Sequence, residues 1–258
     1  MAPRSIWNGT VSVGLINVPV KLYTATESKT VRFREVHLAD AGKVEHRRFC
    51  SVEDVEVPYA EVVKGFEVGE GEYVVLEKDE VAAAAGERGK VIELESFVDS
   101  HAIDPVFFAK TYYMGAGDKG EDAYRLLHEA LGKAGRAGIG RFTFHNREYL
   151  AAVRPLDGLL ALHTMRFSDE VVKGKTIKLE DAKQPSEREV EMAGKLISSL
   201  QEDFDPEKRT DEYREAVLDM IERKAEGKEM PKPKEQPPDE TPDLLAALEA
   251  SLGGGKKG

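Results

Sequence analysis

Polar and apolar residues alternate along much of residues 4–167, and this period of two predicts β-strands. Residues 4–26 ("RSIWNGTVSVGLINVPVKLYTAT") show the alternation twice, on either side of a turn. Short runs bounded by Gly, Pro, Asp or Asn predict further strands at residues 72–76, 90–99, 106–115, 138–155 and 159–167. Residues 121–135 differ, because their leucines and alanines recur at helical spacing. The pattern therefore predicts an antiparallel barrel or sandwich with one inserted helix.

A ribbon of charged residues is predicted within this β-rich part. In "TVRFREVH", residues 30–37, Arg32 and Arg34 lie on one face of a predicted strand, because successive side chains alternate between the two faces. A turn then leads into a returning strand, "VEHRRF", at residues 44–49. The two strands are expected to pair as a basic two-stranded ribbon, with a short helix after it near residues 59–64.

The net charge of -11 is unevenly distributed along the chain. Residues 1–48 contain eight Lys or Arg against four Asp or Glu, so the acidic excess lies in the remainder. A locally basic surface can hold a polyanion on an acidic protein, because salt screens electrostatic fields over about 10 Å. The same charges also fit ordinary solvated strand faces, so charge alone leaves both interpretations open.

The chain changes character at residue 185. Ser186 and Glu189 have the spacing of a capping box and open a predicted helix, and a second helix follows "DFDPEKRT". Residues 230–240 are rich in proline and charge, which predicts a linker. Residues 241–258 are predicted to contain a short amphipathic helix, and a helix of this kind on a flexible tether is expected to dock on a partner. Its candidate partner-binding residues are Leu244, Leu245, Leu248 and Leu252.

The sequence indicates no catalytic, metal or cofactor site. The six histidines lack cysteine partners and the spacing of zinc motifs, and no glycine-rich phosphate loop is present. Cys50, the single cysteine, fits a small hydrophobic residue better than a reactive thiol. No apolar run is long enough to span a membrane and no secretory signal opens the chain, so a cytosolic protein is expected.

Several segments of the chain resemble those of bacterial Ku proteins. They are residues 4–26, "RFREVH", "VPYAEVVKGFEVGEGEYVVLEKDEV", "DPVFFAKTYYM", "GRFTFHNREYLAAVRP" and "KLEDAKQPSEREVEMAGKLISSL". The similarity runs in order over about residues 1–228. Many Ku relatives have a Cys-x-x-Cys pair where this chain reads "Cys50-Ser51-Val52-Glu53", so no metal or redox role is carried over to that loop.

The resemblance implies a homodimer whose barrels and arms form a ring around double-stranded DNA ends. It implies a protein with no catalytic activity of its own and no cofactor, located in the cytoplasm in association with the nucleoid. It also implies recruitment of the ATP-dependent DNA ligase D in non-homologous end joining. The alternative is an adaptor that binds another protein, rather than DNA, through the same basic ribbon; this alternative predicts no dependence on free DNA ends.

On this resemblance the fold is mixed β and α, with an antiparallel β-barrel core, an inserted β-ribbon bridge arm and a C-terminal helical arm in a dimeric ring. The expected divisions are a core at 1–184 that includes the basic bridge arm at about 29–64, a helical arm at 185–229, a linker at 230–240 and a tail at 241–258. The candidate phosphate contacts position the duplex without reading bases. They are Lys29, Arg32, Arg34, Lys43, Arg47, Arg48 and Lys64.

Overall fold

A computed structural model of the chain describes residues 3–84, 90–144, 147–178 and 184–228. Within these ranges the chain divides into two units. The first unit takes the residues up to Ser28 and those from Glu35 to Thr176. The second unit takes Lys29–Arg34 and the residues from Ile177 onward. The predicted bridge arm thus contributes residues to both units.

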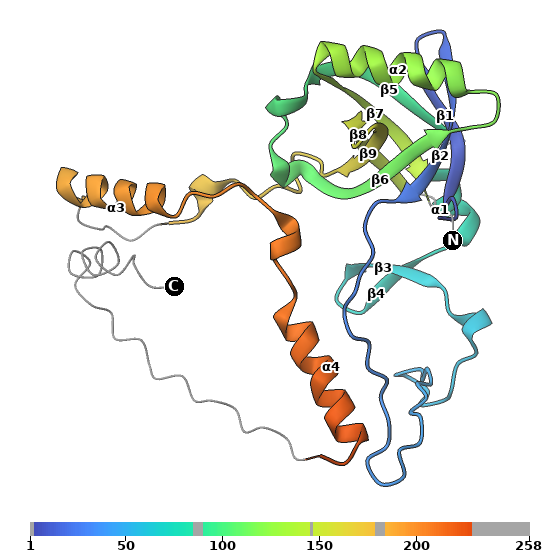
Figure 1. Cartoon of the computed structure of the whole chain (residues 1–258). Coiled ribbons are helices and arrows are strands. Elements are labelled where there is room, and N and C mark those ends of the chain that lie inside the picture. Colours follow the sequence, from blue (N-terminus) through green and yellow to red (C-terminus); the bar gives the residue numbers. More distant parts are fainter. Residues whose placement is uncertain (1–2, 85–89, 145–146, 179–183, 229–258) are drawn as a thin grey trace. The chain divides into compact units, whose positions relative to one another are not determined.

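Seven strands of the first unit close into a barrel (Figure 1). In order around the barrel they are β1 (Trp7–Val13), β2 (Ile16–Thr24), β6 (Phe108–Ala116), β9 (Leu159–Met165), β8 (Arg147–Leu156), β7 (Arg136–Phe144) and β5 (Val91–Asp99). Neighbouring strands are antiparallel except β1 and β5, which pair in parallel. A closed ring with an odd number of strands cannot alternate direction throughout, so one parallel pair is required. The predicted barrel is confirmed, with this parallel pair as its one departure from the antiparallel pattern.

The barrel core follows from the alternation in sequence. Val11 faces Val18 across β1 and β2, and both are fully buried. Leu22, Met114 and Leu160 form an inward-facing row across β2, β6 and β9. Because side chains alternate between the two faces of a strand, every second residue reaches this core and the others face outward.

The helix α2 (Glu121–Ala134) closes one side of the barrel core. Leu131 belongs to the same buried cluster as the strand residues. The hydroxyl of Tyr124 donates to the carbonyl oxygen of Met114 at 2.6 Å and accepts the Leu160 amide at 2.8 Å. It thereby links the helix to both β6 and β9. Gly135 ends the helix in the left-handed region, at φ 62°, as a helix C-terminus commonly requires.

Residues 25–90, here called the insert, connect β2 to β5. Among its described residues it contains the 3-10 turn η1 (Tyr59–Glu61), the strands β3 (Lys64–Gly69) and β4 (Glu72–Leu76), and the helix α1 (Lys78–Ala84). The strands β3 and β4 form a separate two-stranded antiparallel sheet. The insert therefore does contain a β-ribbon, but at residues 64–76.

The ribbon predicted over residues 30–49 is wrong as a continuous ladder. The structure has only two isolated bridges near it, Val36 with Lys43 and Phe49 with Glu56. Phe33 is 72% exposed and Leu38 is 99% exposed. With no buried face to hold the alternating apolar residues in register, the period of two does not enforce a strand here. The short helix predicted near residues 59–64 is reduced to the single turn η1.

The insert leaves and rejoins the barrel beside the same part of β1. Leu22, near the end of β2, lies opposite Trp7, the first residue of β1. After the insert, the Lys90 carbonyl accepts the amide of Thr10 at 2.8 Å, and Val91 pairs with Thr10. Both ends of the insert are thus held along the first half of β1.

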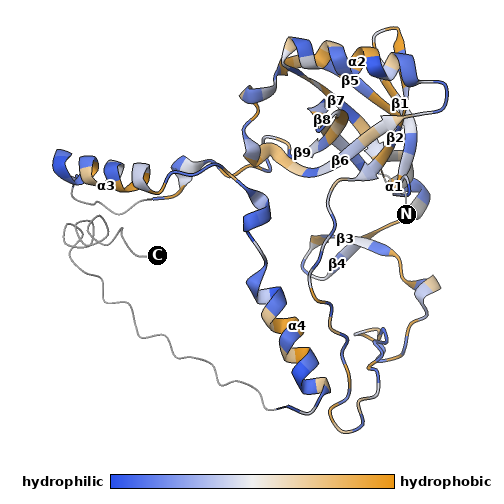
Figure 2. Ribbon diagram, viewed as in Figure 1, coloured by the Kyte–Doolittle hydropathy of each residue, from blue (hydrophilic) through white to orange (hydrophobic). Residues whose placement is uncertain are grey.

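The described part of the second unit contains two longer helices, α3 (Glu187–Ser199) and α4 (Glu212–Ala225). The predicted capping box is confirmed: the Ser186 side chain accepts the Glu189 amide, and the Glu189 carboxylate accepts the Ser186 amide. Figure 2 shows apolar and polar residues side by side along both helices. Val190 and Ile197 of α3, and Leu200 at its C-terminal cap, are all more than half exposed in this chain.

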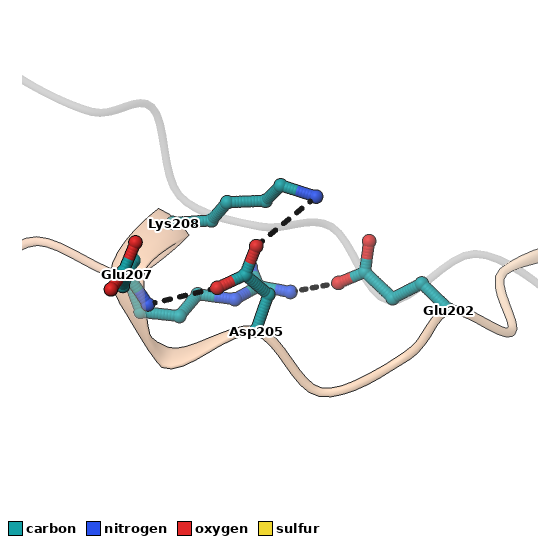
Figure 3. A network of polar contacts seen from close by, with 5 residues as sticks. Glu202, Asp205, Glu207 and Lys208 are labelled. Carbon is teal, nitrogen blue, oxygen red and sulfur yellow. Dashed lines mark hydrogen bonds and ion pairs between the residues drawn. The ribbon is translucent and has the colours of Figure 1, made fainter.

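Polar contacts order the segment between α3 and α4 (Figure 3). Asp205 begins the 3-10 turn η5 (Pro206–Lys208) and accepts the Glu207 amide at 3.1 Å. Its other carboxylate oxygen lies 3.4 Å from Lys208 Nζ, and Glu202 pairs with Arg209. The remaining 3-10 turns, all in the first unit, are η2 (Ser100–Ala102), η3 (Pro105–Phe107) and η4 (Gly174–Thr176).

Candidate nucleic-acid interface

Two turns of the same construction lie beside three of the basic residues of the insert, Lys43, Arg47 and Arg48. In the first, the His37 amide donates to the Gly42 carbonyl and the Ala41 amide to the His37 carbonyl, both at 2.8 Å. In the second, Cys50 occupies the place of His37: its amide donates to Val55 and its carbonyl accepts from Asp54, both at 2.9 Å.

A residue with positive φ closes each turn, at Ala41 (56°) and Asp54 (52°). Such angles are uncommon for residues other than glycine, so their recurrence at matching positions shows a repeated turn geometry. The repeat places Lys43 directly after the first turn, and Arg47 and Arg48 directly before the second.

All seven predicted phosphate contacts are exposed, but the structure does not bring them together in one unit. Lys43, Arg47, Arg48 and Lys64 belong to the first unit, and Lys29, Arg32 and Arg34 to the second. Whether these residues contact phosphate stays a prediction.

The two adjacent arginines have different surroundings. Arg47 Nη1 lies 3.2 Å from Glu56 Oε2, across the second turn. The guanidinium of Arg48 lies over the ring of Tyr59, 4.9 Å from its centroid. A carboxylate partner offsets the charge of Arg47, whereas an aromatic face orients Arg48 and leaves its charge in place. Arg48 is therefore the better placed of the two to attract a phosphate.

The charge of the predicted bridge arm is balanced. Residues 29–64 contain seven Lys or Arg and seven Asp or Glu. A net basic field is therefore absent from the segment as a whole, and its attraction for a polyanion depends on which cations lack a carboxylate neighbour. The acidic side chains are partly engaged elsewhere: Glu35 lies 2.7 Å from His46 Nε2, and Asp40 lies 3.0 Å from His37 Nδ1.

The outer face of the barrel adds a basic group that the sequence did not single out. Arg154 of β8 is half-buried and donates from Nε to Nε2 of His163 on β9, at 3.0 Å. His163 Nδ1 lies 2.9 Å from the hydroxyl of Thr111 on β6. His163 is only 4% exposed, and its ring centroid lies 4.8 Å from that of Phe108. Burial, together with the nearby charge of Arg154, lowers the pKa of His163 to about 4.

Several other cations on the barrel are paired with carboxylates. Lys21 lies 2.6 Å from Asp118, and Arg147 lies 3.7 Å from Glu170. Arg141 contacts both Glu95 and Glu148, at 3.5 and 3.1 Å. The hydrogen bond to Asp118 also raises the pKa of Lys21. Arg154 stands apart from these three, because its partner in the described part of the chain is a histidine.

The described residues include no group of three or more His, Cys, Asp or Glu that could hold a metal ion. Cys50 is a free thiol of intermediate burial. Among the described residues, no helix combines the length and apolar character needed to cross a bilayer. The predicted linker and docking helix, with Leu244, Leu245, Leu248 and Leu252, lie outside the described residues.

Comparison with known proteins relates the chain to one family. Residues 12–192 match the model of the Ku70/Ku80 beta-barrel domain. A non-homologous end joining protein Ku from Anaeromyxobacter sp. (strain K) is 43% identical over 256 residues, which are 98% of this chain and 86% of the relative. The protein of the same name from Bacillus subtilis is 34% identical, over 96% of this chain and 81% of the relative. That from Mycobacterium tuberculosis is 33% identical, over 96% and 94% respectively.

Proposed function

Because this chain belongs to the Ku family of non-homologous end joining proteins, we propose that it forms a homodimeric ring around double-stranded DNA ends. Binding is independent of base sequence and serves the repair of double-strand breaks. The role is one of binding and recruitment, with the joining chemistry supplied by a ligase.

The observation that carries this proposal is the insert. It departs from one side of a complete barrel and returns to the same side, so it is free to extend around a ligand. The seven predicted phosphate contacts within it are exposed side chains on irregular segments and a ribbon. Such groups suit contacts with the phosphate backbone, which fix the position of a duplex and carry no base information.

Exposed apolar side chains support the dimer. Every residue of β3 and β4 is exposed in the single chain, including Phe66 at 65% and Tyr73 at 61%. An isolated two-stranded ribbon is at best marginally stable in water, and exposed apolar patches commonly mark protein contacts. A second copy of the chain, packed against the ribbon and against α3 and α4, would cover these residues.

We extend the proposal to the C-terminal tail, as the docking site for the ATP-dependent DNA ligase D. The leucines at positions 244, 245, 248 and 252 would lie on one face of a short helix. A helix of this length is marginal alone and gains stability when its apolar face is buried on a partner.

A competition experiment tests the central proposal. Labelled linear duplex is bound by the full chain, and unlabelled DNA of the same sequence is added either linear or as closed circles. Linear competitor is expected to displace the label and closed circles to fail, because a closed ring loads only over a free end. Equal competition by mass would reject threading. Failure to bind any duplex would favour the protein-binding adaptor.

A further inference from the structure

A half-buried arginine on the outer face of the barrel has the properties of a preorganised anion-binding group. No carboxylate offsets the charge of Arg154 within the described residues, because its partner there is the imidazole of His163. A half-buried cation without a counter-ion has lost part of its hydration, so an anionic ligand that pairs with it is favoured. Arg141 on the same barrel differs from Arg154, because two glutamates pair with its charge.

The hydrogen bonds around His163 determine which of its two ring nitrogens carries the proton. A guanidinium has no acceptor atom, so Nε2 of His163 must accept the bond from Arg154 Nε. In the neutral ring the proton is then on Nδ1, which donates to the Thr111 hydroxyl. The low pKa of His163 agrees with this neutral form. A protonated ring would instead direct an N–H at the N–H of the guanidinium.

This arrangement orients the guanidinium and leaves its outer edge available. Among the described residues only Nε is engaged, so the two Nη groups retain their donors there, and they form a planar fork that matches phosphate or carboxylate oxygens. Ala161, which lies opposite Arg154 on β9, is fully buried and adds little bulk to this face. Across Ala161, the Asp157 carboxylate accepts a hydrogen bond from the Tyr113 hydroxyl at 2.9 Å, and within the described residues it forms no ion pair with Arg154.

We propose that Arg154 contacts a backbone phosphate of the bound duplex, and that His163 and Thr111 are positioning residues that fix its guanidinium. This inference rests on the proposed DNA-end binding. It adds a contact on the barrel to those expected on the insert, and it assigns a role to the buried histidine of β9.

The charge and the geometry of Arg154 can be tested separately. With the full chain and a linear duplex, Arg154→Gln is expected to weaken binding about tenfold, as loss of a charged hydrogen bond does, and to reduce the salt dependence by about 0.9 in the log–log slope. Arg154→Lys keeps the charge, so it should preserve the slope but still lower the affinity, because lysine lacks the planar fork. The matched control is Arg141→Gln, in which a carboxylate-paired arginine is lost and the slope should stay unchanged.

The positioning role is tested with His163→Leu and His163→Gln. Leucine removes the acceptor for Arg154 and should weaken DNA binding, with no further loss when combined with Arg154→Gln. Glutamine restores an acceptor oxygen and should recover most of the affinity. If His163→Leu fails to fold by circular dichroism, Thr111→Val replaces it, since it removes the group that fixes the Nδ1 proton. Thr111→Val is expected to weaken DNA binding about threefold, because the loss of this positioning contact should cost only part of the free energy of one hydrogen bond.

The outcomes separate this inference from the proposed function. If the wild-type chain binds linear duplex and Arg154→Gln binds it with the same affinity and slope, the phosphate contact is rejected and end binding stands. If Arg154→Gln sediments as a monomer while the wild type is a dimer, Arg154 contacts a carboxylate of the second copy, and the inference is likewise rejected. If the wild type binds no DNA, the proposed function itself fails.

Discussion

The guanidinium of Arg48 lies over the ring of Tyr59, 4.9 Å from its centroid, while its neighbour Arg47 faces a carboxylate. The charge of Arg47 is thus offset by a carboxylate, whereas the charge of the adjacent Arg48 is not. The difference sets an order of importance within the predicted phosphate contacts that the sequence alone does not give.

The first prediction concerns these two arginines. Replacing both with alanine should weaken binding to all duplexes alike, whatever their sequence, and reduce the salt dependence. Of the single variants, Arg48→Ala should lower the log–log slope by about 0.9 and Arg47→Ala by less, because Glu56 already offsets the Arg47 charge. Fluorescence anisotropy over a salt series measures both quantities. As a control, Glu56→Gln should strengthen binding; equal affinity and slope in all four variants would place these side chains away from DNA.

The second prediction concerns the exposed ribbon of the insert. The wild-type chain should sediment at close to twice its 28.5 kDa mass, and Phe66→Ser should shift it toward the monomer at micromolar concentration. Loss of a buried aromatic side chain from an interface is costly, whereas the same change at an uncovered site is nearly neutral. Leu126→Ser on α2 is the matched control, since Leu126 is 64% exposed and Phe66 65%. A wild-type monomer that still binds DNA ends would contradict the ring.

The third prediction concerns His163 and acid stability. Its pKa falls from an ordinary 6.5 to about 4 in the folded chain, mainly through burial and also through the charge of Arg154. Below pH 6.5 the unfolded chain therefore takes up the proton first, and stability is lost as the pH falls from about 6.5 to about 4. The full loss is roughly 3 kcal/mol. Above pH 6.5 this contribution is complete.

Urea unfolding at a series of pH values measures this effect as a difference between two chains. Wild type and His163→Gln should approach one another in stability between pH 6.5 and 4, because the variant lacks the titrating ring. Within the described part of the chain, the groups in contact with the ring are Arg154 from β8, and Thr111 and Phe108 from β6. Parallel pH profiles for the two chains would show that the ring is not buried in its neutral form.

The fourth prediction concerns the C-terminal tail. Deleting residues 231–258 should leave end binding and sedimentation unchanged and abolish stimulation of ligase D, because the tail is proposed to dock on the ligase and to take no part in the core. End binding is measured by gel shift and stimulation by the yield of joined ends. Replacing Leu244 and Leu248 with serine in the full chain tests the leucine face itself. Unchanged stimulation in the deleted chain, or loss of the dimer, would reject the docking role.

The barrel was predictable from sequence because buried residues alternate with less buried ones along strands such as β2 and β6. Val18, Val20 and Leu22 show this alternation in β2, and Tyr112 and Met114 show it in β6. The capping box at Ser186 was predictable for a similar reason, since its chemistry lies within four consecutive residues. Features that depend only on neighbouring residues, such as strand alternation and a capping box, can therefore be predicted from the sequence.

The insert and the Arg154 site were not predictable in this way. Phe33 alternates with Arg32 and Arg34 but is 72% exposed and faces no core, so the alternation predicted a ribbon where the described residues form isolated bridges. Arg154 and His163 become neighbours through the register of β8 on β9, and Thr111 joins them through the register of β6 on β9. Strand register and barrel closure are properties of the whole sheet, so a lone histidine in an apolar strand gave no sign of its partners.

The attachment of both ends of the insert along the first half of β1 makes it a separable module. A segment anchored in this way can be shortened, lengthened or exchanged without passing between strands and without altering the closure of the barrel. The entropic cost of such changes is small, about 0.6 kcal/mol for each doubling of loop length. The length of the insert is therefore free to vary independently of the scaffold, so a designer could graft inserts of other lengths onto the same barrel.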